Sequence, residues 1–146
     1  MTELRELYQE TILDHYRQPR NAGRMADANR VAEGFNPLCG DRIKLFLKVD
    51  DGIISDARFE GSGCAIATAS ASLMTESIKG KRQDEALHLL EQVHHMVAGD
   101  GSDSGVGKLQ VLSGVHEFPQ RVKCATLAWH TMKAALENVT APVTTE

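Results

Sequence analysis

Residues 42–61, RIKLFLKVDDGIISDARFEG, are the stretch that decides the predicted fold. In the first half, apolar side chains alternate with Lys44 and Lys48, which is the period of a β-strand with one buried face. Asp51 and Gly52 are residues typical of a tight reversal, and a second strand-like run follows them. The stretch therefore predicts an antiparallel hairpin that ends near Gly61.

Helical patterns surround this hairpin. Residues 3–17 place apolar side chains at helical spacing, and residues 31–37 are expected to form a first edge strand. Residues 99–107 are rich in glycine and polar residues, which predicts an exposed flexible loop inside the domain. The order of elements predicts one α+β domain over residues 1–146, with frayed ends at 1–2 and 140–146. Further helices are expected at 64–80, 84–98, 109–115 and 120–139.

The composition excludes several classes of protein. With 146 residues, of which 42% are hydrophobic and 25% charged, the chain has the make-up of one globular domain. Its 16 Lys and Arg against 20 Asp and Glu give a net charge of −4, whereas nucleic-acid binding normally requires a clustered basic excess. The sequence has neither a membrane-spanning apolar run nor a secretory signal. We therefore expect a cytoplasmic protein with no nucleic-acid or membrane partner.

Three cysteines are the most informative residues. An odd number in a reducing compartment argues against a disulfide framework and leaves inert buried thiols, catalysis or metal binding. Cys39, Cys64 and Cys124 lie too far apart for C-x-x-C knuckles, so the fold would have to assemble a shared site. Each is expected at the boundary of an element, where free amide groups stabilise a thiolate. All three therefore have a local reason to be reactive.

Asp41 adds a carboxylate two positions after Cys39. Together with the three thiolates it would supply four ligands, the number that fills the tetrahedral shell of zinc, and thiolates also suit iron–sulfur chemistry. The alternative is that the cysteines are small buried apolar residues and Asp41 is a turn residue. Spacing alone does not choose between these interpretations.

Three long motifs contain the cysteines, namely NPLCGDRI, GSGCAIATASASLMTESIKGK and FPQRVKCATLAWHTMKAAL. They resemble the cysteine motifs of the IscU/SufU (NifU N-terminal-like) iron–sulfur cluster assembly family, and the resemblance covers roughly residues 5–138. It implies an N-terminal helix and a three-stranded antiparallel sheet packed by helices, with the cysteines at one exposed end. It also implies the metal-site positions, which are Cys39, Asp41, Cys64 and Cys124.

Two departures indicate the SufU branch of that family. Lys123 stands where the IscU branch has a histidine before its third cysteine, and FPQRVK replaces the chaperone-recognition segment LPPVK. The resemblance then implies a zinc-dependent sulfurtransferase. Cys39 would accept persulfide sulfur from a SufS-type, pyridoxal-phosphate-dependent cysteine desulfurase and pass it to the SUF cluster-building complex. Two alternatives remain, a scaffold for a transient [2Fe-2S] cluster and a structural zinc module.

Two cations beside the third cysteine are candidate partner-binding residues. Arg121 lies three positions before Cys124, so on a helix both side chains project from the same side. We expect Arg121 to meet the desulfurase or to steady the Cys39 loop. Lys123 is expected to favour thiolate character through its charge. For both residues the alternative is a solvated charge on a helix surface.

Overall fold

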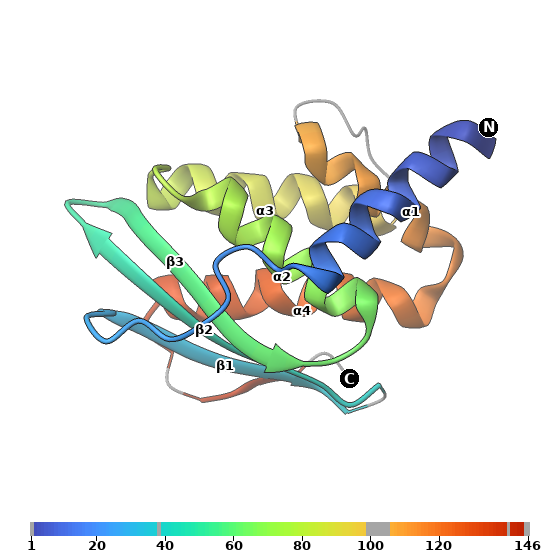
Figure 1. The fold of residues 1–146 in the computed structure, drawn as a ribbon. Coiled ribbons are helices and arrows are strands. Elements are labelled where there is room, and N and C mark those ends of the chain that lie inside the picture. The colour runs from blue at the N-terminus through green and yellow to red at the C-terminus, as the bar shows by residue number, and fades with distance from the viewer. Residues whose placement is uncertain (1, 38, 99–105, 140, 145–146) are drawn as a thin grey trace.

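The computed structural model describes residues 2–37, 39–98, 106–139 and 141–144, and its elements form the predicted α+β arrangement (Figure 1). The side chains of residues 2–8 and 116–117 lie outside this description. In chain order the elements are α1 (Thr2–Arg17), β1 (Arg30–Asn36), β2 (Asp41–Asp50), β3 (Ile53–Ser62), α2 (Ala65–Ile78), α3 (Gln83–Ala98), the 3-10 helix η1 (Gly107–Glu117), α4 (Pro119–Leu136) and β4 (Val143–Thr144).

The sheet has the strand order β3-β2-β1-β4. Strands β2 and β3 form the predicted antiparallel hairpin, and β1 pairs antiparallel with β2 on the other side. Asp51 and Gly52 make the reversal with φ values of 51° and 78°, the positive angles that a two-residue hairpin turn of this kind requires. The alternation of apolar and charged residues thus correctly predicted the strand, and the Asp51-Gly52 pair correctly predicted the turn.

The sheet contains a fourth strand that the expectation of three antiparallel strands left out. Val143 and Thr144 pair parallel with Gly34 and Phe35 of β1, so two residues of the segment expected to be frayed are ordered and β1 is not an edge strand. A two-residue strand has no readable periodicity, and it forms because the outer edge of β1 offers free backbone groups. Residues 1, 140 and 145–146 lie outside the described chain, while α1 already begins at Thr2.

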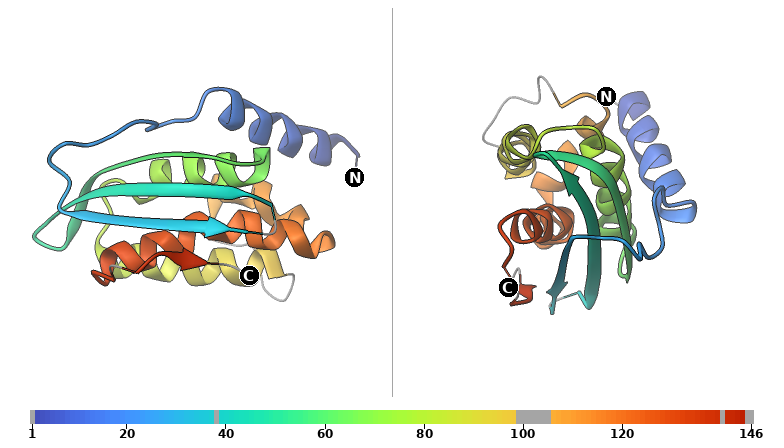
Figure 2. Two further views of the ribbon diagram at one scale, coloured as in Figure 1. Left: turned by 90° about the horizontal axis from the view of Figure 1, so that it is seen from below. Right: turned by 90° about the vertical axis from the view of Figure 1, so that its left-hand side faces the viewer.

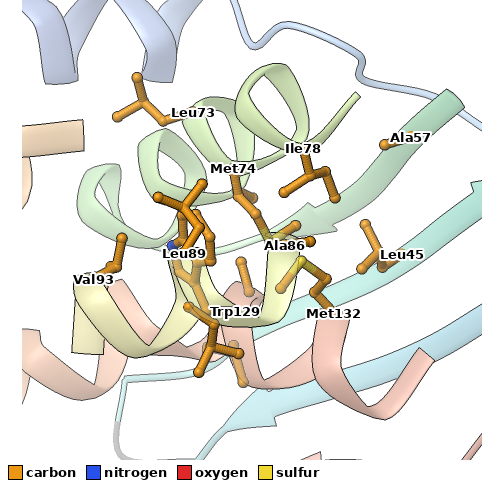
Figure 3. Close-up of a cluster of buried hydrophobic side chains, with 14 of the residues drawn as sticks. Leu45, Ala57, Leu73, Met74, Ile78, Ala86, Leu89, Val93, Trp129 and Met132 are labelled. Carbon is orange, nitrogen blue, oxygen red and sulfur yellow. The ribbon is translucent and has the colours of Figure 1, made fainter. Parts of the chain in front are cut away.

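The helices cover one face of the sheet, as the two views of Figure 2 show. Helices α2 and α4 contact the strands, α3 and η1 pack behind them, and α1 lies against α2. A side chain at Gly34 would collide with Thr131 Oγ1, which explains how α4 approaches β1 so closely. Trp129 of α4, 1% exposed, lies in the core beside α2 and α3 (Figure 3). None of the helices in the described ranges is long and apolar enough to span a bilayer.

Two further expectations concern the segment after α3. The predicted loop over 99–107 falls mostly on residues 99–105, which lie outside the described chain. At its end the prediction is wrong, because Val106 is 5% exposed and Gly107 already belongs to η1. The short helix predicted at 109–115 is present, and it is the 3-10 helix η1 with buried apolar residues facing the core.

Candidate metal centre

The first predicted ligand, Cys39, lies on the tight turn between β1 and β2, at the lower right of Figure 1. The carbonyl oxygen of Asn36 accepts the backbone N–H groups of Cys39 at 3.3 Å and of Gly40 at 2.9 Å. Gly40 adopts a φ of +72°, a left-handed conformation that glycine reaches without steric penalty. The turn thereby brings the Cys39 thiol back to the sheet end, where its sulfur and the ligand atoms of Asp41 and Cys124 all lie within 4.8 Å of one another.

Asp41, the first residue of β2, is fully buried, with 0% of its surface exposed. Its Oδ1 accepts the backbone N–H of Cys64 at 2.9 Å, and its Oδ2 accepts the Asn36 side-chain amide at 3.3 Å. A Cβ atom at Gly63 would sit 2.6 Å from the same Oδ1. The segment between β3 and α2 therefore closes directly over this carboxylate, and only glycine fits at that point.

Cys64 is the N-cap of α2, as the sequence predicted, and its Sγ accepts the backbone N–H of Ala67 at 3.4 Å. Its sulfur does not belong to the group formed by Cys39, Asp41 and Cys124, whose ligand atoms lie within 4.8 Å of one another. It lies next to that group, because its backbone bonds Asp41 and its thiol is close enough to Cys124 to raise the pKa of that residue. Three of the four predicted ligands are thus brought together, and the fourth borders them.

Cys124, in the second turn of α4, is the most enclosed of the cysteines, with 0% of its surface exposed. Its Sγ donates to the carbonyl oxygen of Gln120 and accepts the Asn36 amide, both at 3.6 Å. Burial, and next the hydrogen bonds with Asp41 and Cys39, raise the pKa of the Cys124 thiol far above its ordinary value. The surroundings of Cys124 thus favour its neutral thiol, which is opposite to the local activation expected for all three cysteines.

The chemistry of this donor set fits a divalent metal ion. Two cysteine sulfurs and a buried carboxylate lie together, with Cys64 beside them, and sulfur with one oxygen is a set that zinc accepts. The positive group that the structure describes beside them is the exposed guanidinium of Arg121. Cys39, Asp41 and Cys124, with Cys64 at their border, are the residues that could hold the ion.

The two candidate partner residues point in different directions. Arg121 Nη1 lies 4.0 Å from Cys124 Sγ, on the side that helical spacing predicted, and this contact with the neighbouring thiols raises the pKa of Arg121. Lys123 instead lines an open hollow of about 520 Å³ on the next face of α4, together with Thr126 and His130. The structure therefore gives no support to an effect of Lys123 on the thiols. Its contact with a partner stays a prediction.

Sequence reasoning missed Asn36 and Gly63, which contact the predicted ligands without being ligands themselves. Asn36 precedes a proline and resembles an ordinary turn residue, yet it is fully buried. The signal that could have found it is strand register, because a four-residue turn places Asn36 opposite Asp41 across β1 and β2. Gly63 had no comparable signal, since its role depends on a contact with Asp41 that only the fold creates.

Comparison with known proteins places the geometry in context. Residues 7–145 match the NifU-like N terminal domain family. The zinc-dependent sulfurtransferase SufU of Bacillus subtilis (strain 168) is 46% identical over 129 residues, which cover 87% of each chain. The iron-sulfur cluster assembly scaffold protein IscU of Thermotoga maritima is 44% identical over 137 residues, covering 93% of this chain and 96% of that protein.

A solved structure confirms the fold. The crystal structure of a protein from Fervidobacterium islandicum AW-1, described as a candidate iron-sulfur cluster assembly scaffold for the SUF system, superposes with a TM-score of 0.84. It is 38% identical and covers 87% of this chain and 94% of its own. The expected arrangement of helices on one face of the sheet is thus shared with a protein whose sequence differs at most positions.

Proposed function

Because the chain belongs to the family of NifU-like N-terminal domains, we propose that it is a zinc-dependent sulfurtransferase of iron–sulfur cluster assembly. Cys39 would accept sulfur from a SufS-type, pyridoxal-phosphate-dependent cysteine desulfurase and pass it to the SUF cluster-building complex. The observation that carries this proposal is the difference among the cysteines. Cys39 and Cys64 are both half-buried, but Cys39 lies on a turn held through its backbone, whereas the Cys64 sulfur caps a helix. Cys124 is fully buried.

The position of Cys39 suits the acceptor role. When bound, zinc would keep the surrounding thiols ionised at neutral pH, where free cysteine is largely protonated. The neighbouring Gly40 is exposed, so a partner's cysteine can approach the turn from solvent. Asp41 and Cys124 are fully buried behind it and remain in place during such an approach. The site therefore has a half-buried nucleophile on an exposed turn, in front of two enclosed groups.

The transfer itself is a thiolate–persulfide exchange. The Cys39 thiolate attacks the outer sulfur of the desulfurase persulfide, forming a new S–S bond. The S–S bond of the desulfurase breaks, and its electron pair stays on the desulfurase cysteine, which takes up a proton. Cys39 then carries the persulfide, and no external oxidant or reductant is needed. Arg121, exposed beside the candidate metal centre, supplies a positive charge at the side from which an anionic persulfide would come.

The proposal is tested by locating the sulfur. The zinc-loaded protein is incubated with the desulfurase and cysteine labelled with heavy sulfur, and the peptides are analysed by mass spectrometry without reduction. The label is expected on the Cys39 peptide of the wild type and on no cysteine of Cys39→Ala, whose fold is checked by circular dichroism. Label on none of the wild-type cysteines, or mainly on Cys64 or Cys124, would overturn the proposal.

A scaffold role is the second candidate, and the carboxylate in the donor set favours it. Asp41 gives the site an oxygen ligand, which holds iron less tightly than a fourth thiolate would and suits a [2Fe-2S] cluster that is passed on. Anaerobic reconstitution with iron, cysteine and desulfurase should then produce the visible absorption of a cluster, which an apo-acceptor removes. A colourless protein that keeps its zinc throughout would count against this role.

A structural zinc module is the third candidate. Under it, all three cysteines only hold the fold, so Cys39→Ser would lower thermal stability as much as Cys64→Ser. The Cys64 sulfur accepts the backbone N–H of Ala67 at the start of α2, whereas Cys39 lies on a turn, and this difference argues against equal contributions.

A further inference from the structure

We propose that Asn36 is a positioning residue of the metal centre, whose single side-chain amide sets the spacing between Asp41 and Cys124. The inference rests on the proposed metal site but not on sulfur transfer by Cys39. Asn36 is the last residue of β1, and 0% of its surface is exposed. Its Nδ2 lies 3.3 Å from Asp41 Oδ2 and 3.6 Å from Cys124 Sγ.

The hydrogen-bonding capacity of the amide matches these two partners. An amide nitrogen carries two protons, and an ionised carboxylate and an ionised thiol are both acceptors only. The Asn36 amide can therefore donate one proton to each of them at the same time. The opposite orientation of the amide would place its oxygen against two acceptors, so the ionised site fixes the orientation. No other side chain is described with hydrogen bonds to both groups.

The place of Asn36 in the fold makes it a link between elements. It stands directly opposite Asp41 in the register of β1 and β2, and it reaches across to Cys124 on α4. The backbone N–H of Cys64 holds the other oxygen of Asp41, so that carboxylate is fixed from two sides. Asn36 also accepts, through its carbonyl oxygen, the backbone N–H groups of the Cys39 turn. One residue thus connects the positions of three of the four predicted ligands.

This arrangement has a consequence for metal affinity. Donors that are already aimed at a carboxylate and a thiolate stabilise the ionised forms that a metal ion requires, and they remove motion that binding would otherwise have to suppress. Removing a hydrogen-bonding partner of a metal ligand typically weakens metal binding about 10- to 100-fold. We expect an effect of this size from the loss of the Asn36 amide, without the loss of any ligand.

The test compares Asn36, the last residue of β1, with Asn29, which directly precedes the strand. Asn36→Ala removes the proposed link, and Asn29→Ala removes a different side-chain amide, which bonds the backbone of Val49 far from the cysteines. Zinc affinity is measured on the full chain by competition with a chelator, and the thermal stability of the metal-free chain is measured in parallel. We expect a Kd about 10- to 100-fold weaker for Asn36→Ala and an unchanged Kd for Asn29→Ala.

Binding of cobalt provides a measurement that does not depend on the stability of the fold. The absorption bands of the cobalt-loaded protein report ligand geometry, and they should shift in Asn36→Ala and stay unchanged in Asn29→Ala. If Asn36→Ala does not fold, Asn36→Ser, which keeps one shorter donor, replaces it and should give an intermediate Kd. A wild-type Kd in the Asn36 variant, or an equal rise in the Asn29 variant, would overturn the proposal.

The result also separates this inference from the proposed function. If wild-type Cys39 takes no labelled sulfur while the order of zinc affinities holds, sulfur transfer fails and the role of Asn36 stands. If Cys39 is labelled but Asn36→Ala binds zinc like the wild type, only the role of Asn36 fails.

Discussion

The backbone N–H of Cys64 donates a hydrogen bond to Oδ1 of Asp41 over 2.9 Å, and thereby ties the start of α2 to the start of β2. Both residues are predicted metal ligands, so the backbone of one orients the side chain of the other. Because the carboxylate is buried, this contact also gives its Oδ1 the hydrogen-bond partner that a buried polar atom needs. The candidate metal centre is therefore partly formed by the fold itself, before any ion binds.

Gly63→Ala should disturb this relationship directly. The new Cβ would lie 2.6 Å from Asp41 Oδ1, so the carboxylate or the segment before α2 must move. We expect zinc affinity, measured by chelator competition, to fall by about tenfold or more, as when a metal ligand loses its support. Gly114→Ala is the matched control, because nothing lies within 4 Å of a Cβ at that position. Equal affinities for the two variants would contradict the account.

Cys39→Ala should separate reactivity from stability. Cys39 is half-buried on a turn and lies outside the buried core. The free energy of unfolding of the metal-free variant should therefore lie within about 0.5 kcal/mol of the wild-type value. Cys64→Ala should lower stability more, by about 0.5–1 kcal/mol, because its sulfur caps the N-terminus of α2. Urea denaturation measures both. Stimulation of the desulfurase should vanish in Cys39→Ala, and stimulation at the wild-type rate would rule out Cys39 as the acceptor.

Stability should fall as the solution becomes mildly acidic. His15 is fully buried, its Nδ1 lies 2.7 Å from Ser72 Oγ, and burial above all lowers its pKa below the ordinary 6.5. The unfolded chain therefore binds a proton more readily than the folded chain as the pH falls below that value. The contribution of neutral His15 to the free energy of unfolding is complete above about pH 6.5. It is lost as the pH falls from there to the lowered pKa. Burial, together with His94 and Lys133, lowers the pKa of His130 and adds an effect of the same sign.

The measurement is thermal denaturation of the metal-free chain between pH 7.5 and 5.5, a range chosen to span the ordinary pKa of histidine. His15→Gln keeps a side-chain amide near Ser72 but cannot titrate, so its melting temperature should depend less steeply on pH than that of the wild type. An equal slope in both proteins would show that His15 is not the group responsible.

Arg121→Glu should weaken association with the desulfurase. The guanidinium of Arg121 is exposed and lies 4.0 Å from Cys124 Sγ, at the side of the candidate metal centre where we propose that the desulfurase approaches. Reversing its charge should slow association, most strongly at low salt, because rim charges act mainly on encounter rates. Lys133→Glu makes the same change in the last turn of α4. Surface plasmon resonance should find the larger effect in Arg121→Glu, and equal effects would indicate a dependence on net charge alone.

Much of the fold was predictable because the relevant signals are local. The alternation in residues 42–61 defined the hairpin, and Cys64 was correctly placed at the start of a helix. The parallel pairing of Val143–Thr144 with β1 was missed, because it depends on an edge that exists only after the sheet forms. Pairings between distant segments are set by tertiary contacts, which leave little trace in a short run of residues.

In the candidate site, too, the features with a local sequence signal were predicted and those that depend on tertiary contacts were missed. The motif around Cys39 and Asp41 identified a thiol and a carboxylate that the structure does bring together with Cys124. The role of Asn36 depends on strand register and on the approach of α4, and the burial that raises the pKa of the Cys124 thiol is likewise a tertiary effect. Sequence reasoning thus found residues with suitable chemistry and missed those that orient them.

The central claim is that the side chains of Cys39, Asp41, Cys64 and Cys124 bind one zinc ion. X-ray absorption spectroscopy of the zinc-loaded protein tests this claim most directly. The account predicts one zinc per chain, with three sulfur neighbours at about 2.3 Å and one oxygen neighbour at about 2.0–2.2 Å. Asp41→Ala should change the oxygen contribution and leave the sulfur contribution intact. A first shell dominated by nitrogen or oxygen, or a spectrum that Cys39→Ala and Cys124→Ala leave unchanged, would contradict it.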